Sequence, residues 1–155
     1  MEYIKILNQI EKKQIENILN EQFGIKEIPG KIAIRGEERL FFFTGEIDET
    51  EIRKIEETAP IEKIGVYFAK IINQDIKLTI EGTQILKNQI SKNVFEINDE
   101  QAEEWMMGRE LNIKIGLKGF IVMKNNDDYL GCGKASENKI TNFIPKSRRL
   151  KNRER

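Results

Sequence analysis

The sequence predicts an α+β protein in which a mixed unit of helices and strands, residues 1–90, precedes a small β-barrel over residues 91–155. Apolar residues make up 39% of the 155 residues and charged residues 34%, which supplies a core and a polar surface. The first part alternates helical and strand patterns, whereas the second contains short apolar runs separated by Gly, Asn and Asp. The boundary near residues 90–93 rests on this change of pattern.

Two helices are expected in the first unit. Apolar side chains recur at helical spacing over residues 4–22, and Gly24 can end that helix. In "DETEIRKIEETAP", Asp48 can cap a second helix, Glu51 follows three positions later, and Pro60 lies just beyond its end. The other expected elements are a hairpin in "KIAIRG" and "RLFFFTG", strands in "KIGVYFAKII" and "DIKLTI" joined through Asn73-Gln74, and a short helix in "EGTQILKNQI".

The second unit is expected to combine one helix with short strands. The helix lies in "NDEQAEEWMMG", with Asn98 or Asp99 as its cap and Gly108 as its terminator. Trp105 near its end is expected to cover the barrel. The strands are expected in "NVFEIND", "LNIKIG", "KGFIVMKN", "DYLGCGKAS" and "KITNFIP".

Composition excludes several classes of protein. The single cysteine, Cys132, cannot form an internal disulfide, and this suits a reducing cytoplasm. The chain has no histidine, which removes the usual imidazole base and the commonest zinc ligand. No signal peptide is visible, and no apolar stretch approaches the roughly 20 residues that span a membrane. We therefore expect a cytoplasmic protein with no cofactor, metal or membrane partner.

The "GCGK" turn suggests either nucleotide binding or a cysteine nucleophile, and the sequence supports neither interpretation. A phosphate loop needs G-x-x-x-x-G-K-[ST] before a helix, and a dinucleotide fingerprint would need glycine at Ser136. Cys132 has no histidine to activate it, with only Lys134 on the same side of an extended strand. A small buried residue and a bend at Gly131 and Gly133 are favoured. We therefore expect no catalytic residue and no enzymatic activity.

The net charge of zero hides an asymmetry along the chain. Residues 129–155 hold eight Lys or Arg against two acidic residues, while residues 1–128 hold 18 basic and 24 acidic residues. The closing run "KSRRLKNRER" is either a disordered, solubilising tail or a surface that contacts nucleic-acid phosphates. The second reading gains support because Asn142, Phe143 and Pro145 precede the run, and an amide and an aromatic ring can meet a displayed base.

The segment from Trp105 to Lys151 resembles a PUA domain, a small RNA-binding barrel. It is most similar to the PUA-like ends of Sun/Fmu-type RNA cytosine-5 methyltransferases, where a G-x-G-K strand precedes an N-x-x-P-K-x-x-R run. Here that run is Asn142, Pro145, Lys146 and Arg149. The whole chain also resembles the pre-PUA plus PUA proteins of archaeal and eukaryotic ribosome biogenesis. The methyltransferase catalytic part has no counterpart, because no cofactor-binding Rossmann unit and no Pro-Cys or Thr-Cys setting is found.

These resemblances imply a non-catalytic RNA-binding protein that acts on structured rRNA or tRNA, beside an RNA-modifying enzyme or a pre-ribosomal protein. Two alternatives stay open: an accessory subunit supplied in trans to an RNA methyltransferase, and a protein-interaction module. Contacts after the helix, at Gly108 and Arg109, follow from the PUA resemblance. The full set expected to contact RNA is Gly108, Arg109, Lys134, Asn142, Phe143, Lys146, Arg148, Arg149 and Lys151.

Overall fold

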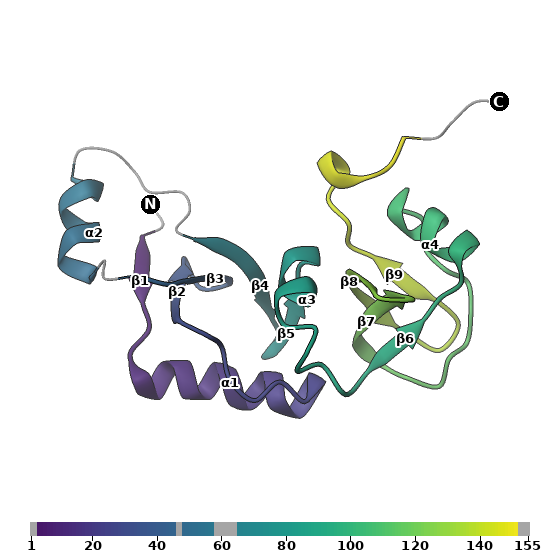
Figure 1. Cartoon of the computed structure of the whole chain (residues 1–155), viewed down its shortest axis with the longest axis horizontal. Coiled ribbons are helices and arrows are strands. Elements are labelled where there is room, and N and C mark those ends of the chain that lie inside the picture. Colours follow the sequence, from purple (N-terminus) through teal and green to yellow (C-terminus); the bar gives the residue numbers. More distant parts are fainter. Residues whose placement is uncertain (1–2, 46–47, 58–64, 152–155) are drawn as a thin grey trace.

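The computed structural model describes residues 3–45, 48–57 and 65–151 of the chain. Two β-sheets lie next to each other along the long axis of the molecule, with the short helix α3 (Ile80–Ile85) between them (Figure 1). The predicted stop at Pro60 and the last four residues of the basic run, 152–155, fall outside the described residues.

The first sheet has five antiparallel strands in the order β1-β2-β3-β4-β5. Both strand pairs expected from the sequence are confirmed: Lys31 lies opposite Phe43, and the last two strands turn at Asn73-Gln74. Both turn residues have positive φ, 50° and 71°, as a two-residue type I′ hairpin requires. The strands are β1 (Ile4–Ile6), β2 (Lys31–Arg35), β3 (Arg39–Phe43), β4 (Val66–Ile72) and β5 (Asp75–Leu78).

The predicted helix over residues 4–22 was wrong at its start, where β1 forms instead. Helix α1 (Gln9–Phe23) begins after Asn8, whose side chain accepts a hydrogen bond from the Glu11 backbone at 2.9 Å. The Glu11 carboxylate accepts one from the Asn8 backbone at 3.1 Å. This capping box fixes the helix start, so the residues before it are free to pair with β2.

The predicted helix caps and glycine stops agree with the structure, but the short helix expected in "EGTQILKNQI" ends earlier, at Ile85. Gly24 ends α1 in the left-handed conformation, with φ of 79°. Asp48 caps α2 (Glu49–Glu56) by accepting from the Glu51 backbone at 2.8 Å. Asn98 caps α4 (Asp99–Met106), and Gly108 follows its last turn with φ of 88°.

The second sheet has the order β6-β7-β8-β9 and is mixed, because β6 runs parallel to β7. Its strands are β6 (Val94–Glu96), β7 (Gly119–Asn125), β8 (Asp128–Ala135) and β9 (Ile140–Asn142). The expected strand in "LNIKIG" is reduced to one bridge between Leu111 and Ile140. The alternation of apolar and polar residues in this segment does reflect burial, because Ile113 and Ile115 are half-buried against the hydrophobic cluster around Trp105. These residues form no ladder of backbone hydrogen bonds with a neighbouring strand in the part of the chain that the structure describes. The chain is thus α+β, and the second sheet is compatible with a PUA-like β domain.

One hydrophobic cluster joins the two sheets. Phe23 and Leu78 from the first part of the chain share it with Phe120, Val122 and Cys132 from the second. A separate cluster under α4 surrounds the fully buried Trp105, as the sequence predicted for that side chain.

A pre-PUA unit ending near residue 90 stays a prediction. Within the described residues, no helix has the length and apolar character needed to cross a membrane.

Candidate functional site

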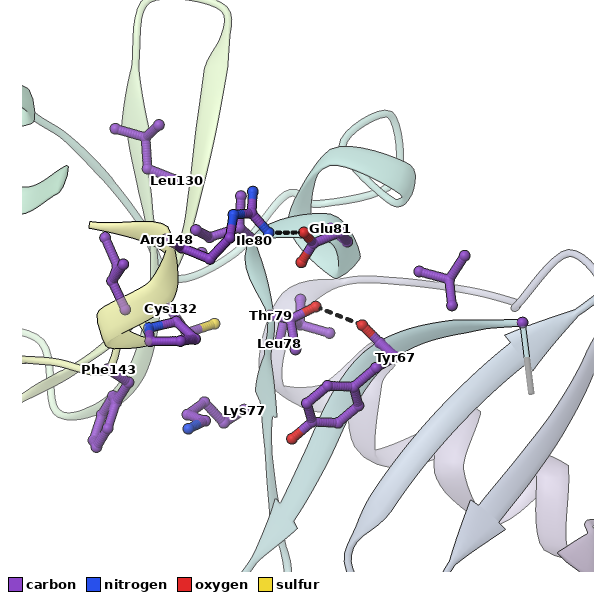
Figure 2. Close-up of a pocket in the computed structure, with 15 residues that line it drawn as sticks. Tyr67, Lys77, Leu78, Thr79, Ile80, Glu81, Leu130, Cys132, Phe143 and Arg148 are labelled. Carbon is purple, nitrogen blue, oxygen red and sulfur yellow. Dashed lines mark hydrogen bonds and ion pairs between the residues drawn. The ribbon is translucent and has the colours of Figure 1, made fainter. Parts of the chain in front are cut away.

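A cavity of 540 Å³ lies at the junction of the two sheets. One wall comes from β4, β5 and the start of α3, and the other from β8 and the segment that follows β9 (Figure 2). Among its lining residues are Tyr67, Lys77, Cys132, Phe143 and Arg148. The cavity is therefore built by parts of the chain that are distant in sequence.

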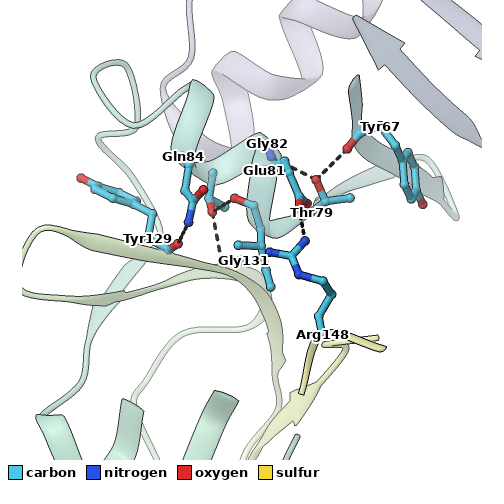
Figure 3. A network of polar contacts seen from close by, with 10 residues as sticks. Tyr67, Thr79, Glu81, Gly82, Gln84, Tyr129, Gly131 and Arg148 are labelled. Atoms are coloured by element: carbon cyan, nitrogen blue, oxygen red, sulfur yellow. Dashed lines mark hydrogen bonds and ion pairs between the residues drawn. The ribbon is translucent and has the colours of Figure 1, made fainter. Parts of the chain in front are cut away.

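Helix α3 is held against both walls by the hydroxyl groups of two threonines (Figure 3). Thr79 caps the helix and donates to the Tyr67 carbonyl in β4 at 2.9 Å. Thr83, fully buried, accepts from the Gly131 backbone in β8 at 3.1 Å. These bonds connect α3 to β4 of the first sheet and to β8 of the second.

The glycines of "GCGK" permit close approach, as the sequence predicted. Gly131 has φ of 81°, and a Cβ there would lie 3.2 Å from the Ile80 side chain. At Gly133, a Cβ would lie 2.5 Å from Ile140 and 2.7 Å from Trp105. Between them Cys132 is buried, and burial raises the pKa of its thiol to about 12. The expectation of a small buried residue at this position is confirmed.

Lys77 is a half-buried charged group that lines the cavity. Its Nζ lies 4.5 Å from the centroid of the Phe143 ring, within range of a cation–π contact. Burial lowers the pKa of Lys77, with a smaller contribution from the like charge of Lys70. No ion pair of Lys77 occurs in the part of the chain that the structure describes. A half-buried ammonium without a carboxylate favours a ligand with acceptor atoms.

The rim of the cavity carries an ion pair between the two sheets. Arg148, in the 3₁₀ turn η1 (Lys146–Arg148), donates to the Glu81 carboxylate of α3. Both side chains stay partly exposed, at 46% and 40%, so the pair is accessible to solvent and exchangeable. Phe143 lines the cavity below this pair and meets Phe120 edge to face, with centroids 6.1 Å apart.

Four of the predicted contact residues meet at the end of α4. The Asn142 amide donates to the carbonyls of Trp105, at 2.8 Å, and Arg109, at 3.0 Å, and its oxygen accepts from the Ile144 backbone at 2.8 Å. Arg149 donates from Nε to the Ile144 carbonyl at 3.0 Å. Its side chain lies against Gly108, where a Cβ would collide with it. Asn142 and Arg149 thus make structural contacts within the protein.

The remaining predicted residues lie on the surface or at the cavity. Arg109 pairs with Glu104 at 2.8 Å. Lys134, Lys146 and Lys151 are exposed and have no ion pair within residues 3–45, 48–57 and 65–151. Lys134 also lies over the Phe120 ring, 5.7 Å from its centroid, while the residue stays exposed to solvent.

Sequence reasoning missed Tyr67, Lys77 and Glu81. In β5, Lys77 separates the buried Ile76 and Leu78, a pattern that predicts a solvent-facing side chain. Lys77 lines a cavity only because the second sheet packs opposite it. Elsewhere, no group of three or more His, Cys, Asp or Glu able to hold a metal ion is found among the described residues.

Comparison with known proteins gives consistent results. The family model described as the methyltransferase RsmF PUA domain matches residues 92–150. Ribosomal RNA small subunit methyltransferase F of Shewanella oneidensis is 29% identical over 136 residues, covering 86% of this chain and 27% of that protein. Its counterpart in Psychromonas ingrahamii is 28% identical over 127 residues, covering 81% of this chain and 26% of that protein.

A similarity of 136 residues is longer than the region matched by the family model, so it also includes part of the first sheet. The chain spans about a quarter of the length of these two curated relatives. Residues 92–150 carry the matched domain together with the G-x-G-K strand and the N-x-x-P-K-x-x-R run. This part of the chain is therefore a PUA-like region of the Sun/Fmu type.

Proposed function

We propose that this protein is a non-catalytic RNA-binding unit that acts in rRNA modification. The observation that carries the proposal is the match of residues 92–150 to a PUA domain of a methyltransferase family. The relatives are named as ribosomal RNA methyltransferases of the small subunit, which favours rRNA over tRNA as the partner.

The contacts proposed for RNA fall into two groups. Lys134, Lys146 and Lys151 contact phosphates directly, because they are exposed and unpaired within the described part of the chain. Arg148 joins them by exchanging its surface partner Glu81 for a phosphate. The other predicted residues shape or border this surface: Gly108, Arg109, Asn142, Phe143 and Arg149.

The test is the salt dependence of RNA binding. Fluorescence anisotropy would measure the affinity of labelled small-subunit rRNA fragments between 50 and 200 mM salt, conditions over which phosphate contacts lose affinity steeply. Each contact adds about 0.7–0.9 to the slope of log K against log salt. The Lys134/Lys146/Lys151→Ala triple variant is therefore expected to bind more weakly, with a slope lower by about 2–3.

A matched triple variant controls for net charge. Lys13, Lys26 and Lys31 are exposed in the first part of the chain, and their replacement by alanine removes the same charge. This control is expected to keep the wild-type slope. Equal losses in both variants would show that only overall charge matters, and an unchanged first variant would place the RNA elsewhere. Absence of RNA binding by the wild type would overturn the proposal and leave the protein-interaction alternative.

The names of the relatives favour a second candidate role, as an RNA-binding accessory to a methyltransferase catalytic part. Affinity purification from lysate treated with ribonuclease separates the two. A stoichiometric RNA methyltransferase that stays bound after the treatment supports the accessory role. Recovery of rRNA alone from untreated lysate supports independent RNA binding.

A further inference from the structure

We propose that the cavity between the two sheets receives one unstacked nucleotide of the bound RNA, with the base inside and the phosphate at the rim. This inference rests on the proposed function and extends it to a site that contains residues of both sheets. The cavity volume of 540 Å³ falls in the range of roughly 300–1,000 Å³ that is typical of small-ligand pockets.

The charges of the cavity suit such a ligand. Its charged lining residues are Lys77, Glu81 and Arg148, and the carboxylate is already paired with the guanidinium at the rim. Lys77 inside is left without an ion pair in the described part of the chain. The interior is therefore positive, which favours acceptor atoms such as the carbonyl oxygens of guanine or uracil.

The walls suit a flat ring. Tyr67 and Phe143 contribute aromatic side chains from opposite sides, with Lys77 between them (Figure 2). The backbone at Gly131 forms part of the lining, and the absence of a Cβ there lets β8 lie close to Ile80 of α3. RNA-binding proteins commonly hold splayed-out bases between aromatic rings and polar groups of this kind.

The cavity is also continuous with the proposed phosphate surface. Phe143, Pro145 and Arg148 line it, and Lys146 lies between the last two in the chain. A strand of RNA whose phosphates follow the exposed lysines would therefore pass the cavity mouth. Release of Glu81 by Arg148 would then place the guanidinium on the phosphate of the inserted nucleotide.

The test compares single-stranded with paired RNA. Labelled U10 and a blunt G·C duplex would be titrated against wild type, Lys77→Met and the control Lys13→Met, after thermal melts show that each variant is folded. Lys77→Met keeps the length of the side chain but removes its charge. We expect it to weaken U10 binding about tenfold, the effect of one good contact to a base, and to leave duplex binding within about twofold. The exposed Lys13 of α1 is expected to matter for neither.

A second measurement does not depend on a variant. In methyl-labelled wild-type protein, addition of U10 is expected to shift the NMR signals of Ile80 and Ile144, which line the cavity. The signal of Ile10, 73% exposed on α1, is expected to stay in place. Unshifted cavity methyls, or equal effects of Lys77→Met on U10 and duplex, would overturn the nucleotide pocket while leaving RNA binding intact. Failure of the wild type to bind either RNA would overturn both proposals.

Discussion

Replacing Asn142 with alanine is expected to lower the free energy of unfolding by about 1.5–3 kcal/mol. Its amide donates to the Trp105 and Arg109 carbonyls and accepts from the Ile144 backbone, so three hydrogen bonds are lost at once. Each contributes about 0.5–1.5 kcal/mol net, and the bond to Arg109 is exposed, which keeps the sum below the upper limit. The loss loosens the junction between α4 and the segment after β9.

Urea unfolding followed by circular dichroism measures this effect. With a slope of about 2 kcal/mol/M, the midpoint should fall by about 0.8–1.5 M. The control is Asn112→Ala, since Asn112 is exposed and forms no hydrogen bond to any described residue. A wild-type midpoint for Asn142→Ala, together with weakened RNA binding, would refute the structural role and support the base contact that the sequence predicted.

Three further outcomes are expected. Gly133→Ala should lower the unfolding free energy by about 1–3 kcal/mol in urea titrations, because its Cβ would meet Trp105 at 2.7 Å; a neutral effect would mean the core adjusts freely. Cys132, with a pKa raised to about 12, should react with iodoacetamide at pH 8 at least about 1,000-fold more slowly than in urea-unfolded protein, measured by mass spectrometry. Rapid labelling of the native protein would contradict its burial. A double-mutant cycle on Glu81→Gln and Arg148→Gln should give a coupling energy of about 1 kcal/mol or less, because both side chains are over a third exposed. A larger coupling energy would mean that the ion pair contributes substantially to holding η1 against α3.

Local signals in the sequence predicted the parts of the fold that local physics decides. The caps Asp48 and Asn98 and the stop at Gly24 each satisfy backbone groups at helix ends, and each was identified from residue type and position. Helical periodicity before Asn8 misled, because Ile4 and Leu7 fit helical spacing while Ile4 and Ile6 fit the alternation of a strand. Pairing with β2 decided the outcome there.

The candidate site was only partly predictable, because part of it depends on contacts between distant segments of the chain. The basic segment is a run of neighbouring residues, so composition alone identifies Lys146, Arg148 and Lys151. Composition does not reveal that Arg148 already has a partner, nor that Lys77 faces a cavity wall from another sheet. Both facts depend on contacts between residues more than 50 positions apart.

The proposed nucleotide pocket would give the first sheet a part in RNA recognition that the acidic excess over residues 1–128 does not suggest. Tyr67 and Lys77 belong to the first sheet, and the hydrophobic cluster that joins the two sheets includes Phe143 and the two neighbours of Lys77, Ile76 and Leu78. Similarity to the curated relatives likewise covers more than the PUA-like region. If the first part of the chain were only a docking module for a protein partner, there would be no reason for its lysine to lie half-buried beside the ring of Phe143. The proposed recognition of a nucleotide by both sheets would give that arrangement a function.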